Sequence, residues 1–409
     1  MKVPSNWIKV KFSDIVENVT DRIDKPSESG LKDYIGLDEL DTDQIRIKRF
    51  ASTSDVDATK FLCKKGDIIF GKRNAYLRKV AVCDRAAVVS AHSMIFRPKG
   101  DLIDPDFLPC LLQSSTFWRT AHAISEGSMS PTIKWKILSK QEFFILPIKE
   151  QKKIAGILWA IEDNIEKTEK LIEINEKLKK GLLNELLTKG IGHKKFKKTE
   201  IGEIPEEWDL VKLEDVSTQI TDGTHKTPKY TMNGIPFLST TNVIPFKKGF
   251  DFSSYRKFIS NDEHEELIKR CKPEKGDILI SKCGTIGRTK IIDVNYQFSI
   301  FVGLALVKID HSKIFDKYLE QLLNSDLIQE QMRILSPGST RNTLAINAIE
   351  KIQVTLPNLN EQKRISKILE KFDMQTQTYE YHLIRLNLLK KKLTDELLTG
   401  KIRLGGKYV

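Results

Sequence analysis

The sequence contains two copies of one pattern, and this internal duplication constrains the fold more than any single motif does. The run Lys-Gly-Asp-Ile occurs at residues 65–68 and again at 275–278, and Glu-Leu-Leu-Thr closes the two copies at 185–188 and 396–399. Shared motifs keep the same order, and the offset between the copies grows only from 201 to 211 residues. Small loop insertions produce such a drift, so we predict two copies of one domain.

Each copy changes its expected secondary structure once, at a Leu-Pro pair. Before Pro147, short apolar segments such as 65–70 and 91–97 are bounded by glycine, proline or charge, which is typical of strands; after it the apolar residues follow a helical period. We therefore predict an α+β fold, in which two similar mixed α/β domains are joined by two long antiparallel coiled-coil helices as a pseudo-two-fold internal repeat. The expected boundaries are domains at 1–147 and 204–357, helices at 148–190 and 358–400, a linker at 191–203 and a tail at 401–409.

The predicted helices carry matching apolar stripes. In both, the apolar positions alternate in steps of three and four, which indicates the seam of a coiled coil. A helix over residues 150–187 would be about 55 Å long and too narrowly apolar to be stable alone, so its nearest candidate partner is the other copy. A coiled coil that joins separate chains remains an alternative. The seam residues are Ile154, Leu158, Ile161, Ile165, Ile172 and Leu182, and then Ile365, Leu369, Phe372, Tyr379, Leu383 and Leu393.

Charge and cysteine usage narrow the class of protein. The formal net charge is +12 over 409 residues, which indicates a polyanionic partner such as nucleic acid, although a basic soluble enzyme would also fit. Five scattered cysteines without a C-x-x-C pair predict neither a zinc ribbon nor a disulfide framework. Charges interrupt every apolar run, so we expect no membrane contact and a reducing, cytoplasmic location.

Catalytic motifs are missing from the sequence. It has no Pro-Pro pair, no G-x-G-x-x-G and no Walker loop. The sequence therefore shows no binding motif for a methyl-donor cofactor or for ATP. His264-Glu265 begins like a zinc-protease motif but lacks the second histidine. The E-x-K sequence at 150–152 lacks an acidic partner for a nuclease metal, and a favourable charge at a helix N-terminus explains Glu150 better. We expect no catalytic residue, no metal and no cofactor.

Polar, basic turns are the candidate DNA contacts. Two follow strands at equivalent places, over 71–79 and 281–290, and two hydroxyl-rich loops precede the Leu-Pro pairs. Arginine, lysine and asparagine side chains can reach base edges or phosphates, and small hydroxyl loops suit phosphates. Solvated hairpin turns are the alternative, and residues 284–287 also match the G-x-x-G loop of an RNA-binding fold. The candidates are Lys72, Arg73, Asn74, Tyr76, Arg78, Ser128, Ser130, Thr240, Asn242, Lys282, Thr285, Arg288, Ser339, Arg341 and Asn342.

Taken together, these motifs resemble the specificity subunits of Type I restriction-modification enzymes. The resemblance covers nearly the whole chain in duplicate, through Pro205-x-x-Trp208, Lys-Gly-Asp-Ile, residues 284–287 and 338–341, Leu356-Pro357 with Glu361-Gln362, and Glu-Leu-Leu-Thr. Around residues 127–131 the first copy departs from the family pattern, because it lacks the arginine found at Arg341.

The resemblance implies a non-catalytic subunit that binds double-stranded DNA. Each target recognition domain would read one half of an interrupted site, and the two helices would set the spacer like a ruler. The helices would also dock two adenine methyltransferase subunits, which bring S-adenosylmethionine, and ATP-driven endonuclease/translocase subunits would join that core. A stand-alone nuclease or methyltransferase, or a coiled-coil scaffold that binds no DNA, are the rival classes.

Overall fold

A long helix closes each half of the chain, and its limits follow from local sequence. In the computed structural model, which describes residues 6–54, 56–243, 257–336 and 343–404, α5 spans Ile148–Lys189 and α11 spans Leu359–Leu398. A proline precedes each helix, where its missing N–H is tolerated. Gly190 and Gly400 follow their last turns with φ of 68° and 73°, the left-handed conformation that ends a helix.

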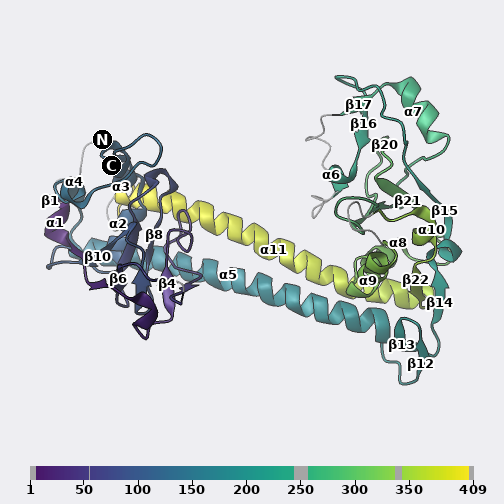
Figure 1. The fold of residues 1–409 in the computed structure, drawn as a ribbon, viewed down its shortest axis with the longest axis horizontal. Coiled ribbons are helices and arrows are strands. Elements are labelled where there is room, and N and C mark those ends of the chain that lie inside the picture. The colour runs from purple at the N-terminus through teal and green to yellow at the C-terminus, as the bar shows by residue number, and fades with distance from the viewer. Residues whose placement is uncertain (1–5, 55, 244–256, 337–342, 405–409) are drawn as a thin grey trace. The chain divides into compact units, whose positions relative to one another are not determined.

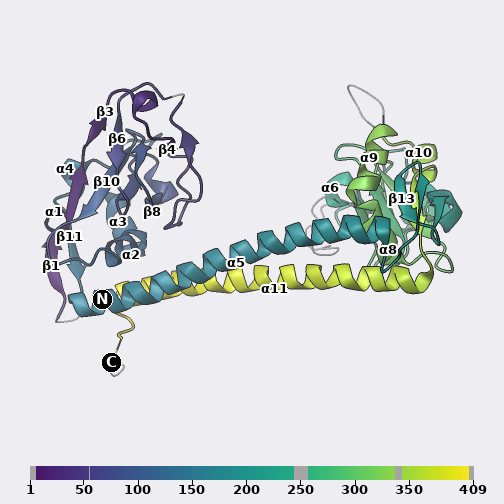
Figure 2. The same cartoon turned by 90° about the horizontal axis from the view of Figure 1, so that it is seen from below.

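The chain divides into two compact units, and each unit contains parts of both long helices. The first unit comprises Met1–Lys170 and Glu380–Val409, and the second comprises Leu171–Tyr379. Within each unit, α5 and α11 lie side by side (Figure 1, Figure 2). Each unit is therefore a globular domain with one half of each helix. Ile402 and Leu404, which follow α11, pack against the core of the first domain.

The described residues of the first unit form three sheets. Their strand orders are β1-β11, β2-β10-β7-β8 and β3-β6-β9-β4-β5. The four-stranded sheet is antiparallel, and α2 and α3 share the main core with it and with α5. The elements are β1 (Ile8–Lys11), α1 (Phe12–Ile15), β2 (Val16–Val19), β3 (Arg22–Ile23), η1 (Pro26–Glu28), β4 (Asp33–Ile35), β5 (Ala51–Ser52), β6 (Lys60–Cys63), β7 (Ile68–Gly71), η2 (Ala75–Leu77), β8 (Val80–Val82), β9 (Ala87–Val89), β10 (Ser93–Pro98), α2 (Phe107–Gln113), α3 (Ser115–Ala123), α4 (Trp135–Leu138) and β11 (Glu142–Ile145).

The second unit repeats this plan. Its sheets β14-β22 and β15-β21-β18-β19 match β1-β11 and β2-β10-β7-β8 in order and direction, and it also contains the sheets β17-β16-β20 and β12-β13. The predicted duplication and mixed α/β fold are thus confirmed. The elements are β12 (Phe196–Thr199), β13 (Gly202–Pro205), β14 (Asp209–Lys212), η3 (Leu213–Val216), β15 (Ser217–Asp222), β16 (Ile235–Leu238), α6 (Thr240–Val243), β17 (Phe258–Ile259), α7 (Asn261–Ile268), β18 (Ile278–Ser281), β19 (Thr289–Ile291), β20 (Ser299–Ile300), β21 (Leu304–Ile309), α8 (Asp316–Leu323), α9 (Asp326–Ile334), α10 (Ile346–Glu350) and β22 (Gln353–Leu356).

The connector after α5 is more ordered than its lysine-rich sequence indicates. The sequence predicts a simple linker over residues 191–203, but β12 and β13 form an antiparallel hairpin there, with Phe196 opposite Pro205. Glu361 of α11, which is 6% exposed, accepts hydrogen bonds from the Ile191 backbone and from Trp208 Nε1, both at 3.0 Å. The connector is therefore tied to the start of the second long helix.

The helix seam is buried at its ends and half-exposed between them. In the first unit, Ile154, Leu158, Ile161 and Ile165 are buried, and Leu383 and Leu393 are half-buried. In the second unit, Ile365 and Leu369 are buried, and Ile172, Leu182, Phe372 and Tyr379 are half-buried.

Polar contacts between the helices fix their antiparallel direction inside each unit. Lys390 forms an ion pair with Glu162 in the first unit, and Lys179 forms one with Asp373 in the second. Both lysines and both acids are offset by 211 residues, so the duplicated helices use the same pairing twice. Asn175 adds a hydrogen bond of 2.7 Å to Thr376 Oγ1. A buried polar pairing of this kind favours one register over its neighbours.

Candidate nucleic-acid interface

The turn after β7 in the first unit presents the first group of candidate residues. The Gly71 N–H donates to the Lys79 carbonyl at 2.9 Å and closes the turn. Asn74 and Arg78 flank η2 with φ of 55° and 50°. Few non-glycine residues adopt this left-handed conformation, and such backbone strain concentrates at functional sites. Tyr76 lies between them with 59% of its surface exposed. The turn thus projects an aromatic ring and polar groups into solvent.

The structure brings two predicted loops of the first unit together. Ser130 Oγ donates to Asn74 Oδ1 at 2.9 Å, and Arg73 is bridged through the backbone to Thr132. Ser128 lies exposed in the same loop. The turn over 71–79 and the loop over 127–132 therefore form one surface, although Asn74 and Ser130 are 56 residues apart in sequence.

The cations of this surface differ in their availability. Arg73 is exposed, and its Nη1 lies 3.4 Å from His92 Nε2. Arg78 is engaged, because its Nε lies 2.9 Å from Asp43 Oδ1 and its Nη2 donates to the Gln113 carbonyl. Arg73 is therefore a stronger candidate for contact with a ligand than Arg78.

The second unit builds the equivalent turn with different chemistry. Ser281 N–H donates to the Arg288 carbonyl at 2.9 Å, and Cys283 is bridged to Thr343 as Arg73 is to Thr132. Thr285 and Arg288 are exposed. Ser339, Arg341 and Asn342 lie outside the described residues. The two units therefore present unlike side chains from equivalent backbone positions.

Lys282 is buried in an ion pair, which removes it from the set of exposed candidates. It is 6% exposed, and its Nζ lies 2.5 Å from Oδ2 of Asp222, which is itself 4% exposed. Burial alone would raise the pKa of Asp222, but the hydrogen bond and charge of Lys282, followed by His225 and Arg270, outweigh it and lower that pKa. The Lys282 ammonium therefore stabilises the fold of the second unit.

Asp222, Arg270 and His225 were not among the residues that the sequence predicts for this site. Lys282, His225 and Arg270 all pair with the Asp222 carboxylate, although up to 60 residues separate them from it in sequence. Comparison of the two repeats could have pointed to Asp222, because the equivalent residue of the first repeat, Thr20, carries no charge. The drifting offset and an irregularity in β15 between Ser217 and Gln219 hid that correspondence.

Thr240 and Asn242 lie beside the second turn. A side chain at Gly303 would approach both Thr240 Cγ2 and Cys283 Sγ to 3.0 Å, so the glycine permits this close packing. Asn242 Oδ1 accepts from the Ser239 backbone at 2.8 Å, which stabilises the start of α6. Thr240 is thus close to the candidate turn, while the Asn242 amide oxygen has a structural contact.

The residues of the nuclease-like motif at 150–152 and of the protease-like motif at His264 make contacts that stabilise the fold. Glu150 Oε1 accepts from Asn6 and Arg403, both at 3.0 Å, and Gln151 is fully buried, where it donates to two backbone carbonyls. His264 is 3% exposed and lies 2.8 Å from Ser299 Oγ. These contacts explain why the residues are present without invoking catalysis.

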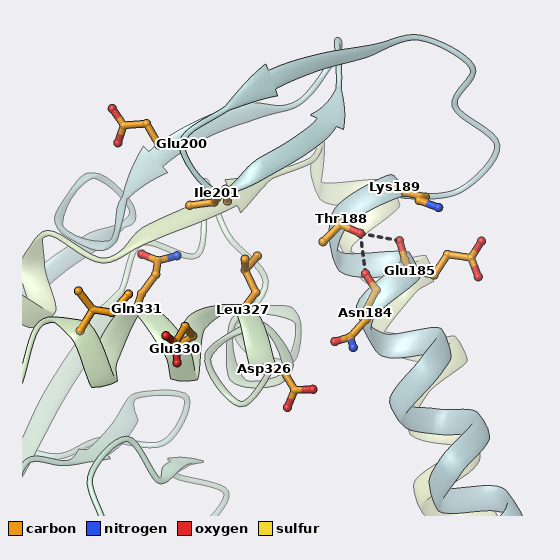
Figure 3. Close-up of a pocket in the computed structure, with 11 residues that line it drawn as sticks. Asn184, Glu185, Thr188, Lys189, Glu200, Ile201, Asp326, Leu327, Glu330 and Gln331 are labelled. Atoms are coloured by element: carbon orange, nitrogen blue, oxygen red, sulfur yellow. Dashed lines mark hydrogen bonds between the residues drawn. The ribbon is translucent and has the colours of Figure 1, made fainter.

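A groove of the second unit has the opposite charge to the candidate turns. Figure 3 shows it between the end of α5, the region of β12 and β13, and α9. Its volume is about 840 Å³, and its lining includes Glu185, Glu200, Asp326 and Glu330 with one lysine, Lys189. Four carboxylates make this groove unsuitable for a phosphate backbone. The candidate DNA contacts therefore belong to the turns.

Known proteins share the duplicated architecture. A family model described as "Type I restriction modification DNA specificity domain" matches residues 4–176 and again 205–387. The MjaVIII Type I restriction enzyme specificity subunit of Methanocaldococcus jannaschii is 26% identical, with 98% of this chain and 94% of that protein covered. Within the described residues, neither long helix contains an apolar stretch of the length and hydropathy that crossing a bilayer requires.

Solved structures support the fold. A chain from work on complex assembly and conformational transition of the type I R-M system aligns with a TM-score of 0.61 at 20% identity, covering 98% of this chain and 100% of the other. The HsdS subunit from Thermoanaerobacter tengcongensis aligns with a TM-score of 0.52 at 19% identity, covering 98% and 99%.

Proposed function

The chain belongs to the Type I restriction-modification DNA specificity family, and we propose that it is the DNA-recognition subunit of such a complex, each unit reading one half of an interrupted site. One observation carries this proposal. The turns over 71–79 and 281–290 occupy equivalent backbone positions and carry different polar side chains. A shared scaffold with unlike contact residues is what two different half-sites require.

The subunit recognises DNA and leaves catalysis to its partners. The partners that we propose are two adenine methyltransferase subunits, which supply S-adenosylmethionine, and endonuclease/translocase subunits that use ATP. Exposed apolar side chains on the long helices support one docking surface in each unit. Leu171, Ile174 and Leu178 are exposed on α5 in the second unit, and Tyr381, Ile384 and Leu388 are exposed on α11 in the first. Both sets have spacings of three and four, so each lies on one helix face.

If each unit reads its own half-site, one substitution should relax the sequence specificity at one half-site only. We expect Arg73→Ala and Arg288→Ala to broaden the methylated motif in opposite halves, because each exposed arginine belongs to a different unit. Losing a bidentate base contact costs about 1–3 kcal/mol at that base pair. The measurement is methylome sequencing of a host that carries the gene and its methyltransferase partner. Arg333→Ala, which removes an exposed arginine paired with Glu330, is the matched control and should leave the motif unchanged.

The results separate base reading from phosphate binding. Uniform weakening of methylation by Arg73→Ala would make this residue a phosphate contact. A change in both half-sites from one substitution would contradict the assignment of one half-site to each unit. Absence of sequence-specific methylation by the wild-type complex would contradict the proposed function itself.

The long helices are proposed to set the gap between half-sites. Duplicating four residues in α5 after Lys170 and four in α11 before Glu380 keeps the pairings inside each unit. The insertion adds about 6 Å at 1.5 Å per residue, close to two base-pair steps. We expect the methylated motif to keep its two halves and to gain spacer length. A motif with an unchanged gap would assign the spacing to the partner subunits or to DNA bending.

A further inference from the structure

The first unit contains a polar pocket beside the turn that follows β7. Its volume is about 340 Å³, and Asn18, Thr20, Lys72 and Ser93 contribute to its polar lining. Lys72 is half-buried, and none of the carboxylates in the described part of the chain forms an ion pair with its ammonium. The pocket therefore presents a cation whose charge these residues do not neutralise.

The second unit has a lysine at the same place. The backbone hydrogen bonds of Lys72 and Lys282 are equivalent. The N–H of each lysine donates to the residue before β10 or β21, and its carbonyl accepts from the segment that precedes α4 or α10. The partners are His92 and Ile133 for Lys72, and Gly303 and Leu344 for Lys282.

The neighbours of the two lysines differ in one decisive residue. Thr20 and Asp222 occupy equivalent places, because the residues that precede them pair with equivalent positions of β10 and β21. Asp222 neutralises Lys282 at 2.5 Å and is buried with it. Thr20 is exposed, carries no charge and lines the open pocket with Lys72. The same site is thus closed by an ion pair in one repeat and open in the other.

The surroundings of the open pocket favour an anion. Burial, followed by the neighbouring charge of Arg73, lowers the pKa of Lys72. Burial and then the charges of Arg73, Lys72 and Lys60 lower the pKa of His92. Beside burial, both shifts contain repulsion between neighbouring cations, which a bound anion would relieve.

A buried hydroxyl provides a second, independent observation. Ser93, which lines the pocket, is fully buried, and its Oγ has no hydrogen-bond partner within the described residues. Leaving a buried hydroxyl without a partner costs about 1–3 kcal/mol. The hydroxyl can donate a hydrogen bond to an anionic oxygen beside Lys72. Asn18 Oδ1 also lacks a partner there, and rotation of the amide would present its NH₂ group to the same anion.

We propose that this pocket binds a phosphate oxygen of the DNA backbone, and that the second unit lacks the contact because Asp222 replaces it. The proposal rests on the function proposed above. A phosphodiester carries the full negative charge that the cations lack, whereas a base edge offers neutral acceptors. Lys72 then positions the first unit on DNA, and sequence is read by exposed neighbours such as Arg73 and Tyr76.

Copying the carboxylate of the second unit into the first tests this proposal. Thr20→Asp should neutralise Lys72, and the exposed position of Thr20 makes the change tolerable for folding, which a thermal melt verifies. The assay is DNA binding by the complex with its methyltransferase at 50 and 200 mM salt. One lost phosphate contact reduces the log-log salt slope by about 0.9, so raising the salt should weaken the variant about 3.5-fold less than the wild type. Thr20→Asn, similar in size and uncharged, should keep the wild-type slope.

A second variant and a second DNA separate the outcomes. Lys72→Gln should reduce the salt slope of DNA binding by the same amount as Thr20→Asp. The double variant with both substitutions should show no further reduction of the slope. Affinity should fall equally for cognate and non-cognate DNA, since phosphate contacts carry no sequence information. An unchanged slope in a folded variant would overturn the phosphate site, as would a loss confined to one base pair of the cognate site. Wild-type binding without sequence preference would instead overturn the proposed function.

Discussion

Replacing Leu158 by aspartate is expected to unfold the first unit. Leu158 is 3% exposed and belongs to the core that α5 shares with α2, α3 and the sheets. The substitution removes a buried leucine, which costs about 2–5 kcal/mol, and places an unpaired carboxylate in an apolar site, which adds several more. The sum is comparable with the net stability of a domain, about 5–15 kcal/mol. Thermal unfolding followed by circular dichroism measures the loss.

The same helix provides the matched control for this prediction. Leu171 also lies on α5 but is 43% exposed, so Leu171→Asp should change stability by less than about 1 kcal/mol. Its effect should instead appear as weaker assembly with the methyltransferase, if the proposed docking surface is correct. A Leu158→Asp protein that melts like the wild type would show that this position is not part of the core in solution.

Local sequence was sufficient to predict the duplicated plan and the long helices. The prolines before α5 and α11, the glycines after them and the three-four spacing of apolar residues act over a few residues. The helices accordingly span Ile148–Lys189 and Leu359–Leu398, close to the expected limits. Periodicity also identified the residues that are most deeply buried, such as Leu158 and Leu369.

Elements that depend on distant residues could not be predicted. The strands β3, β4 and β5 contain only two or three residues each, too few for an alternating pattern to be recognised. The hairpin of β12 and β13 is formed by a lysine-rich segment whose composition indicated a loop. Glu361, far along the chain, ties this segment to α11. Long-range packing outweighed local propensity in both cases.

The candidate contact residues illustrate the same limit. The sequence identified the equivalent turns, but it gave no means of separating exposed Arg73 and Arg288 from Arg78, which pairs with Asp43. From sequence alone Lys282 falls among the exposed cations, because its partner, Asp222, lies 60 residues earlier. Burial and ion pairing are tertiary properties, so chemically similar residues in equivalent turns acquire different roles.

Removing the Asp222 carboxylate is expected to destabilise the second unit. Asp222→Ala leaves Lys282 buried without a counter-charge, and breaking a buried ion pair in this way costs about 3–5 kcal/mol. Arg270 and His225 should contribute little to this loss, because both are largely exposed and can turn to water. The measurement is the free energy of unfolding from denaturant melts at neutral pH.

The double variant Asp222→Ala with Lys282→Met distinguishes a lost charge partner from lost packing. Most of the stability should return, because an apolar side chain of similar length occupies the site without desolvating a charge. The wild type should also lose the contribution of the ion pair in acid. The pKa of Asp222 is lowered in the folded protein, so the ion pair stabilises the fold fully above the ordinary aspartate pKa of 3.8. This stabilisation disappears as the pH falls through the pKa of Asp222 in the folded protein. The double variant should lack this acid-dependent loss. If it is no more stable than Asp222→Ala alone, the carboxylate acts through packing or through Arg270, and the difference between Thr20 and Asp222 no longer measures the charge of the equivalent lysines.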